Sequence, residues 1–283
     1  MPNICLYLHA HQPIRLAKYS VFDIGSGKSY FDDEQNRFYI NRIAQKSYRP
    51  LNTLLSRLIE RYGKDFKVSF SITGALLEQF ELFAPDVLED FQDLVATGNV
   101  ELISETYYHS LASQFSPTEF REQTLLQENV FQNLFNQSPK TFRNTELAYN
   151  NRIAELVDSS KYTCILTEGV DRILGWRSPN FVYSTRGKNK KHLLLKNYKL
   201  SDDIAFRFSQ KSWSGWPLTA DKFTQWVDEI EGDGVTINLF MDYETFGEHQ
   251  WESTGIFDFL RSLPGEILNH PDNNFKTPMQ VLD

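Results

Sequence analysis

Cysteine is scarce in this 283-residue sequence, which contains only Cys5 and Cys164, each inside an apolar run. Cysteines in such surroundings are expected to be buried thiols rather than a disulfide, and two are too few for a cysteine-based metal site. The apolar runs are far shorter than a membrane span, and the first residues lack the basic region and apolar core of a signal peptide. We therefore expect a soluble, cytoplasmic protein with no membrane partner.

An excess of positive charge and glycine-rich phosphate loops are also missing. The formal charge is −8, whereas binding to a phosphate backbone needs a basic face, so nucleic acid is not expected as a partner. The one basic cluster, residues 186–191, is best interpreted as a solvated loop. No expected strand-to-helix turn carries a glycine-rich loop, which disfavours a nucleotide-binding protein.

Apolar residues are plentiful, at 41% of the chain, and aromatic residues reach 14%. This is ample for a sizeable core, and no segment has the composition of a linker between domains, so one domain is expected. Short β-branched runs predict the strands. These strands are expected over residues 4–8, 67–72, 100–103, 140–143, 163–166 and 235–241, with further strand material over 193–195 and 204–208.

Helical patterns separate these strands. The clearest is Ser116-Pro117-Thr118-Glu119, which supplies an N-cap, a proline at the first helical position and a capping-box glutamate for a helix that should reach Phe135. Residues 14–47 lack a clean periodicity and are expected to be loop with short elements. Other helices are expected over residues 50–63, 75–84, 85–97, around 153–157, and over 219–230 with Thr219 as the cap.

The alternation of strands and helices predicts right-handed βαβ units and a parallel sheet. About seven such units in one chain favour a closed or nearly closed α/β barrel, with the helices outside, over an open doubly wound sheet.

Polar side chains follow several of these strands where each strand ends. The carboxyl ends of parallel barrel strands meet at one mouth, so we expect these side chains to converge there. They are His9 and His11; Glu101, Glu105 and His109; Glu146; and Asp242, Glu244 and His249.

Taken singly, these residues leave alternatives open. His9 and His11 are two residues apart and face the same side of a strand, where they can bind substrate, bind a metal or serve as scaffold. Glu101 lies inside an apolar strand, so it needs either an ion pair, for instance with Arg143, or a substrate-binding role. Glu146 can be catalytic or a solvated carboxylate at a helix N-terminus.

Four stretches together resemble, in order and spacing, conserved regions of glycoside hydrolase family 57, and the resemblance is closest to its α-amylase-like members. Flanking residues 167–169, 175–180 and 216–223 extend it across nearly the whole chain. The four stretches are His9-Ala10-His11-Gln12-Pro13, Gly98-Asn99-Val100-Glu101-Leu102, Phe142-Arg143-Asn144-Thr145-Glu146-Leu147 and Met241-Asp242-Tyr243-Glu244-Thr245-Phe246-Gly247.

The resemblance implies an incomplete (β/α)7 barrel that acts on α-glucans with retention of configuration. It matches Glu146 to the nucleophile and Asp242 to the general acid/base, and it places His11 and Glu101 near the site. The barrel is expected to fill one catalytic domain, 1–283. The helical region and fifth motif that usually follow the barrel in this family have no match here, so we expect them to be absent.

The substrate is expected to be an α-glucan or maltooligosaccharide cleaved at α-1,4-glucosidic bonds, with no cofactor and no metal in the site. Aromatic rings are platforms on which sugar rings stack, although aromatic core is the likelier interpretation for at least one tryptophan. The expected substrate-binding residues are His9, His11, Glu101, His109, Glu244, Trp176, Trp213 and Trp216.

A retaining glycosidase needs two carboxyl groups roughly 5–5.5 Å apart on opposite sides of the scissile bond. We expect Glu146 to attack the anomeric carbon while a protonated Asp242 donates to the leaving oxygen. An ordinary aspartate is ionised at neutral pH, so desolvation or the nearby Glu244 and Glu146 should favour its protonated form. Arg143 and the histidines should keep Glu146 ionised.

Other functions stay open. Glucan transfer, as in a 4-α-glucanotransferase or a branching enzyme, uses the same two carboxylates and replaces water with a sugar hydroxyl. A metal-dependent deacetylase-like hydrolase would bind its metal through His9, His11, His109 and Asp242. A non-catalytic glucan-binding protein would bind the sugar without turnover.

Overall fold

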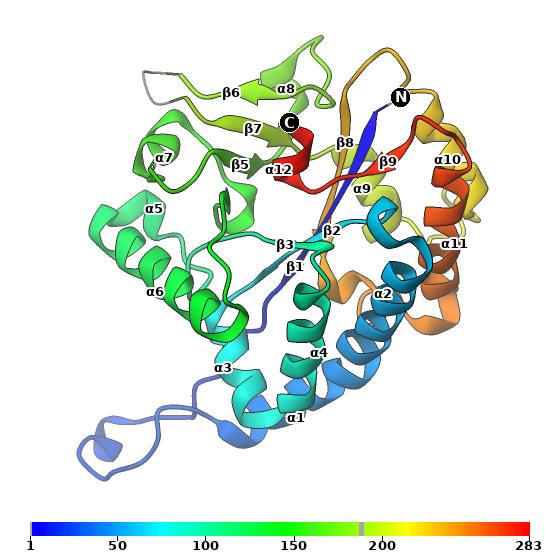
Figure 1. Ribbon diagram of the computed structural model, residues 1–283. Helices are drawn as coiled ribbons and strands as arrows, with labels where there is room; N and C mark the ends of the chain where they lie inside the picture. Colours follow the sequence, from blue (N-terminus) through cyan, green and yellow to red (C-terminus); the bar gives the residue numbers. More distant parts are fainter. Residues whose placement is uncertain (1, 159, 187–189) are drawn as a thin grey trace.

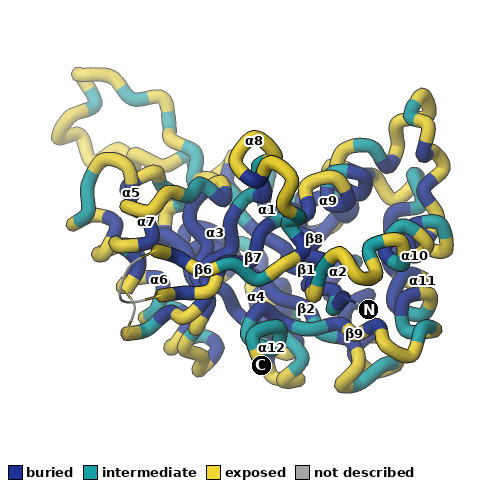
Figure 2. Tube along the Cα trace, turned by 90° about the horizontal axis from the view of Figure 1, so that it is seen from above, coloured by how far each residue is buried: buried dark blue, intermediate teal, exposed yellow. Residues whose placement is uncertain are grey.

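The computed structural model describes residues 2–158, 160–186 and 190–283 of the chain. Within these residues, seven parallel strands form the inside of the molecule and helices cover the outside (Figure 1). Figure 2 shows the same arrangement as a buried centre with an exposed periphery. No helix among the described residues is both long and apolar enough to cross a membrane.

The first sheet contains most of the long strands. Its order is β3 (Val100–Leu102), β2 (Val68–Ile72), β1 (Asn3–Ala10) and β8 (Thr236–Asp242), all parallel. A short strand, β9 (Asn274–Phe275), pairs with the beginning of β1.

The second sheet is shorter. Three of its strands, β4 (Thr141–Arg143), β5 (Cys164–Thr167) and β7 (His192–Leu195), are parallel, and β6 (Tyr183–Ser184) is antiparallel at the edge.

The two sheets meet at both sides. Ser104, after β3, bridges to Phe142 of β4 in parallel register. On the other side, the described residues contain no ladder between β7 and β8; instead the Asn197 N–H donates to the Asn238 carbonyl at 2.9 Å and Asn238 Nδ2 donates to the Leu195 carbonyl at 2.8 Å. The ring is therefore nearly closed, which confirms the expected incomplete barrel.

Apolar residues fill both sides of this ring. Cys5, Tyr7, Cys164 and Phe240 belong to the cluster inside it, so both thiols are buried and free, as expected. A larger cluster lies between the first sheet and its helices. The helices are α1 (Asp33–Ile43), α2 (Arg49–Tyr62), α3 (Gly74–Phe83), α4 (Pro85–Ala96), α5 (Ala112–Phe115), α6 (Pro117–Phe135), α7 (Asn151–Leu156), α8 (Asp171–Leu174), α9 (Tyr198–Ala205), α10 (Ala220–Asp228), α11 (Ile256–Leu268) and α12 (Pro278–Val281).

The start and the end of α6 are as predicted. The Ser116 side chain accepts a hydrogen bond from the Glu119 N–H at 3.2 Å, and the helix ends at Phe135. The predicted capping box is wrong, because the Glu119 carboxylate accepts from Gln123 Nε2 at 2.7 Å rather than from the Ser116 backbone. Thr219 is the N-cap residue of α10 as predicted, although its side chain accepts no hydrogen bond from a backbone N–H of the first turn.

Three other predictions need correction. Residues 33–48 are α1 and a π-helical turn rather than the expected loop with short elements. Asp32 caps the helix, and the sequence shows no clean periodicity there because only a few positions, such as Ile40 and Ile43, face the core. Residues 204–208 are the end of α9 and a turn, not a strand. In the basic cluster, residues 187–189 lie outside the described residues, and Lys191 is buried with Nζ donating to the Ala154 carbonyl at 2.9 Å.

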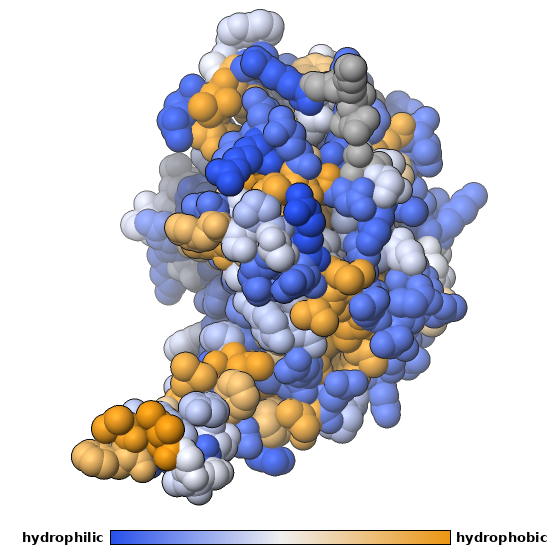
Figure 3. Space-filling view, turned by 90° about the vertical axis from the view of Figure 1, so that its left-hand side faces the viewer, coloured by the Kyte–Doolittle hydropathy of each residue, from blue (hydrophilic) through white to orange (hydrophobic). Residues whose placement is uncertain are grey.

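Residues 11–32 are the irregular excursion that the sequence predicts after the first strand. This excursion projects from the body of the molecule (Figure 1) and carries apolar side chains on its surface (Figure 3). Leu16, Val21, Phe22 and Ile24 are among the exposed ones.

Candidate active site

The strand ends converge as the sequence predicts. His9 of β1, Arg143 of β4, Glu146 after β4 and Asp242 of β8 line one cavity of about 160 Å³. The cavity lies inside the ring of strands, where residues from distant parts of the chain meet. Its other lining residues are Tyr7, Leu147, Glu168, Lys196, Ala205, Phe206, Phe240, Met241, Thr245 and His249.

Glu146 reaches the cavity through an unusual turn, residues Thr145–Leu147, that follows β4. Glu146 and Leu147 have left-handed φ values of 57° and 53°, which cost non-glycine residues about 1–3 kcal/mol each. The turn is held by Thr145, whose hydroxyl donates to the Ser110 carbonyl at 2.6 Å. Glu146 therefore presents a side chain that is 72% exposed, while its neighbours on both sides are buried.

His109 is the nearest partner of Glu146. Its Nε2 lies 2.8 Å from Glu146 Oε1, and its backbone is also left-handed, with φ 53°. The hydrogen bond from His109 and the charge of Arg143 hold the pKa of Glu146 below its ordinary value. This is the expected influence of Arg143 and the histidines, and it keeps Glu146 ionised.

Glu105 lies at the centre of the site and is fully buried. Its Oε2 is 3.1 Å from His9 Nε2, 3.5 Å from His109 Nδ1 and 3.5 Å from Arg143 Nη1. Burial alone would raise the pKa of Glu105, but these three partners outweigh it and hold the pKa well below its usual range. Glu105 is thus a buried carboxylate that stays ionised.

His9 and His11 face the same side, as expected. Burial lowers the pKa of both, that of His11 to about 3, so both rings are neutral at neutral pH. The His11 ring stacks on His109 with centroids 4.3 Å apart, and His11 Nδ1 lies 2.9 Å from Thr73 Oγ1.

Asp242 ends β8 opposite these histidines. Its Oδ1 is 3.8 Å from His9 Nδ1, and its side chain is 54% exposed. Desolvation, one of the two influences expected at this residue, is therefore slight. The buried carboxyl group here is that of Glu244. It accepts hydrogen bonds from the Tyr48 hydroxyl and from Gln12 Nε2 at 3.4 Å. Burial raises the pKa of Glu244 to about 7.

Glu101 is one of the predicted residues that do not line this cavity; His11, His109 and Glu244 are not among its lining residues either. Glu101 Oε1 accepts from the Thr141 hydroxyl at 2.6 Å and its Oε2 from the Met279 N–H at 3.0 Å, toward the amino ends of the strands. Of the two alternatives left open for Glu101, the ion pair with Arg143 is not formed, because the carboxylate beside Arg143 is Glu105. The sequence signal for Glu105 was its place after β3, at the strand end rather than inside the strand.

The three tryptophans expected to bind sugar also lie outside this cavity. Trp176 is almost fully exposed and Trp216 partly so. Trp213 packs against the core and meets Trp226 edge-on at 5.9 Å, beside a separate cleft of about 730 Å³. The aromatic side chains that line the cavity are Tyr7, Phe206 and Phe240, which the sequence analysis did not single out.

One group of side chains has the spacing of a metal site. The ligand atoms of His9, Glu105 and His109 lie within 4.8 Å of one another. Arg143 Nη1, however, is only 3.5 Å from the Glu105 oxygen that a metal would use. A guanidinium cation at that distance already balances the carboxylate and repels a metal ion, so this donor set does not fit one.

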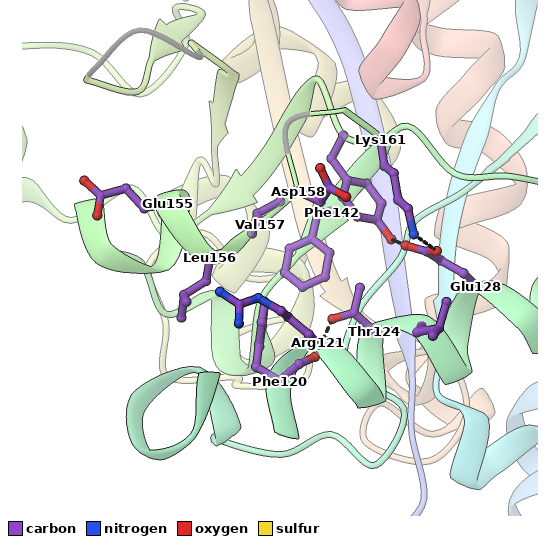
Figure 4. A pocket seen from close by; sticks show the side chains of 12 residues that line it. Phe120, Arg121, Thr124, Glu128, Phe142, Glu155, Leu156, Val157, Asp158 and Lys161 are labelled. Atoms are coloured by element: carbon purple, nitrogen blue, oxygen red, sulfur yellow. Dashed lines mark hydrogen bonds and ion pairs between the residues drawn. The ribbon is translucent and has the colours of Figure 1, made fainter. Parts of the chain in front are cut away.

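Two further clefts differ in their relation to the cavity. One of about 360 Å³ continues from it, because both share Glu146, Leu147 and Glu168, and this cleft includes Tyr149 and Tyr183. The other, of about 420 Å³, lies between α6 and α7 on the outside of the barrel (Figure 4). None of the site residues described above lines that outer cleft.

Comparison with known proteins places these residues in a family. The family model of Glycosyl hydrolase family 57 matches residues 5–283. A curated protein of Methanocaldococcus jannaschii named "Putative alpha-amylase" is 47% identical over 283 residues, which cover 99% of this chain and 59% of that protein. The chain thus spans about three fifths of the length of this relative.

Solved structures show the same fold at low identity. The 4-alpha-glucanotransferase from Thermococcus litoralis matches with a TM-score of 0.75 and 18% identity, over 99% of this chain and 40% of that one. The GH57-type branching enzyme from the archaeon Pyrococcus horikoshii matches with a TM-score of 0.69 and 16% identity, over 100% of this chain and 70% of that one.

Proposed function

The chain belongs to glycosyl hydrolase family 57, and we propose that it is an α-amylase-like enzyme that cleaves α-1,4-glucosidic bonds of α-glucans or maltooligosaccharides with retention of configuration. The observation that carries this proposal is the pair Glu146 and Asp242, which come from different strands and line one cavity. In this proposal, residues 1–283 form a single catalytic barrel domain.

The first half of the proposed reaction uses both carboxyl groups. A Glu146 oxygen bonds to the anomeric carbon as the bond from that carbon to the glycosidic oxygen breaks. Asp242 gives its proton to the departing oxygen, so the leaving sugar is released as an alcohol. The ionised state of Glu146, supported by His109 and Arg143, suits this attack.

The second half reverses the roles. Asp242, now a carboxylate, takes a proton from water while the water oxygen bonds to the anomeric carbon and Glu146 leaves. A sugar hydroxyl in place of water would give glucan transfer. The cleft of about 360 Å³ that adjoins Glu146 has room for further sugar rings, and its tyrosines offer surfaces for them.

Product analysis tests the proposal. Linear maltooligosaccharides are incubated with the purified chain and with Glu146→Gln, and the products are separated by chromatography and followed by proton NMR. Shorter products, first released as the α anomer and absent from the variant, are expected. Longer products together with shorter ones would indicate transfer.

Three outcomes would contradict the hydrolase proposal. They are a β anomer as the first product, undiminished turnover by a folded Glu146→Gln variant, and sugar binding without any product from the intact chain. Circular dichroism of both proteins establishes that the variant is folded. Activity that disappears with a chelator and returns with added metal would instead support a metal-dependent hydrolase.

A further inference from the structure

A single buried oxygen connects the two carboxylates of the candidate site. Glu105 Oε2 faces one ring nitrogen of His9 and one of His109. The opposite nitrogens of the same two rings face Asp242, at 3.8 Å, and Glu146, at 2.8 Å. The five side chains therefore form a continuous path from one proposed catalytic group to the other.

We propose that Glu105 is a positioning residue that fixes the proton of His9 on Nε2, so that the lone pair of His9 Nδ1 is turned toward Asp242. The inference rests on the proposed function for the roles of Asp242 and Glu146. It assigns to Glu105 a task that neither the family resemblance nor the sequence pattern gave it.

The argument for His9 starts from the ionised Glu105. A carboxylate is only an acceptor, so His9 Nε2 must donate its proton to it across 3.1 Å. In a neutral ring the other nitrogen, Nδ1, then carries a lone pair, and this lone pair faces Asp242 Oδ1. At 3.8 Å the two atoms are beyond hydrogen-bond distance, and a protonated Asp242 would donate to this acceptor once they approach, which suits the general acid.

His109 has the opposite polarity toward its carboxylate. Glu146 is ionised and accepts, so the proton of His109 belongs on Nε2, 2.8 Å from Glu146 Oε1. The other nitrogen, Nδ1, faces Glu105 at 3.5 Å without a hydrogen bond, so Glu146 rather than Glu105 sets the proton of His109. His9 thus turns an acceptor toward Asp242, and His109 turns a donor toward Glu146.

The groups around Glu105 support a positioning role over a packing role. Arg143 from β4 supplies the positive charge that balances Glu105, and the charges of both residues act on the Tyr7 hydroxyl of β1. Glu105 Oε1 and Arg143 Nε are buried and have no hydrogen-bond partner among the described residues. A group that served packing alone would be better replaced by an apolar side chain, since incompletely paired buried charges are destabilising.

The test compares Glu105→Gln with a matched control, Glu128→Gln. Glu128 also accepts a hydrogen bond from a buried side chain, the Tyr162 hydroxyl at 2.7 Å, and also pairs with a cation, Lys161, but it lies outside the cavity. In Glu105→Gln we expect kcat on maltooligosaccharides to fall at least about tenfold with little change in KM, and the pH dependence of kcat/KM to shift. In Glu128→Gln only the melting temperature should fall.

If Glu105→Gln does not fold, Glu105→Asp keeps the charge and withdraws it from both rings. The same loss of kcat with a shifted pH profile is expected in this variant. A folded Glu105 variant with the pH profile and kcat of the intact chain would overturn the inference.

Nitrogen-15 NMR of the histidine rings gives a readout that does not need activity. Signals are assigned with His9→Gln and His109→Gln. We expect His9 to be protonated on Nε2 and not on Nδ1, and Glu105→Gln to lose this preference. A proton on His9 Nδ1 in the intact chain would overturn the inference, even if the chain were active. Conversely, an inactive chain with the expected tautomers would contradict the proposed function but leave the inference standing.

Discussion

Glu101 and Glu105 are glutamates at opposite ends of one barrel, and their carboxylates have different partners. Glu105 is fully buried and Glu101 is partly buried, and the two follow each other closely in one segment of the chain. Glu101, toward the amino ends of the strands, is held by a hydroxyl and a backbone N–H, both neutral. Glu105, at the carboxyl ends, faces two histidines and an arginine and leaves one oxygen unpaired. At the amino end both oxygens of the carboxylate accept hydrogen bonds, whereas at the carboxyl end the carboxylate contacts the residues of the candidate site.

The backbone repeats this contrast. Among the described residues, the non-glycine positions with left-handed φ are His109, Glu146 and Leu147 at the carboxyl end and Asn136 at the C-terminus of α6. Asn136 is in the ordinary position for a helix cap. The strain at the other three positions is concentrated beside the proposed catalytic groups, which is where strained residues are usually found.

The largest expected effect concerns the exposed carboxyl group of the carboxyl end. Asp242→Asn should lower kcat on maltooligosaccharides by about 10²–10⁴-fold, because an amide cannot give a proton to the leaving oxygen. A glycosyl fluoride, whose leaving group needs no proton, should lose much less of its rate in the first step. Equal losses on both substrates would remove Asp242 from the role of acid.

The next effect tests the charge balance of the same end. Arg143→Met should lower the free energy of unfolding by about 3–5 kcal/mol, because it leaves Glu105 buried without its cation. Urea denaturation of both proteins measures this. Arg143→Met together with Glu105→Gln should recover part of the loss, since the uncompensated charge is gone. Additive losses in the double variant would show that the two side chains do not interact.

Glu244 sharpens the comparison, because it is a buried carboxyl of the same end with a raised pKa of about 7 against an ordinary 4.5. Between these pH values the folded chain keeps a proton that the unfolded chain has lost, so stability should fall as pH rises from about 4.5 to about 7. The fall should amount to at most about 3 kcal/mol. Glu244→Gln should flatten this part of the stability curve, and an unchanged slope would contradict the raised pKa.

The smallest effect is expected at the amino end. Glu101→Gln should cost about 1–2 kcal/mol of stability, because an amide cannot accept from both Thr141 and the Met279 N–H. Its kcat and KM should match those of the intact chain. A large loss of activity without a loss of stability would break the comparison and favour the role near the site that the family resemblance implies for Glu101.

The sequence predicted those parts of the fold that local chemistry decides. Ser116 and Pro117 placed the start of α6, and the β-branched runs placed most strands within one or two residues. The segment 33–43 was missed because its buried side chains, Asn36, Ile40 and Ile43, are too few to give an apolar stripe. Tertiary packing, rather than local pattern, makes this segment a helix.

The sequence predicted several of the residues that meet at the candidate site, but it predicted fewer of the contacts between them. Spacing alone placed His9, Glu146 and Asp242 at strand ends, and they do line one cavity. The predicted strand 100–103 already placed Glu105 past a strand end and Glu101 inside the strand, but no local pattern showed that Arg143, on another strand, lies beside Glu105. Likewise, Phe206 reaches the cavity only because α9 ends beside it, a consequence of chain packing that no local pattern reports.

In the part of the chain that the structure describes, the barrel is closed between β7 and β8 by individual hydrogen bonds rather than by a strand ladder. Two hydrogen bonds hold it, one from the Asn238 side-chain amide to the Leu195 carbonyl and one from the Asn197 N–H to the Asn238 carbonyl, and both can break while every strand ladder stays intact. Local opening of the barrel should therefore begin between β7 and β8. Deuterium should enter the Asn197 amide sooner than the amides at the centre of β1, and the wall that carries Lys196 should move apart from the wall that carries Asp242.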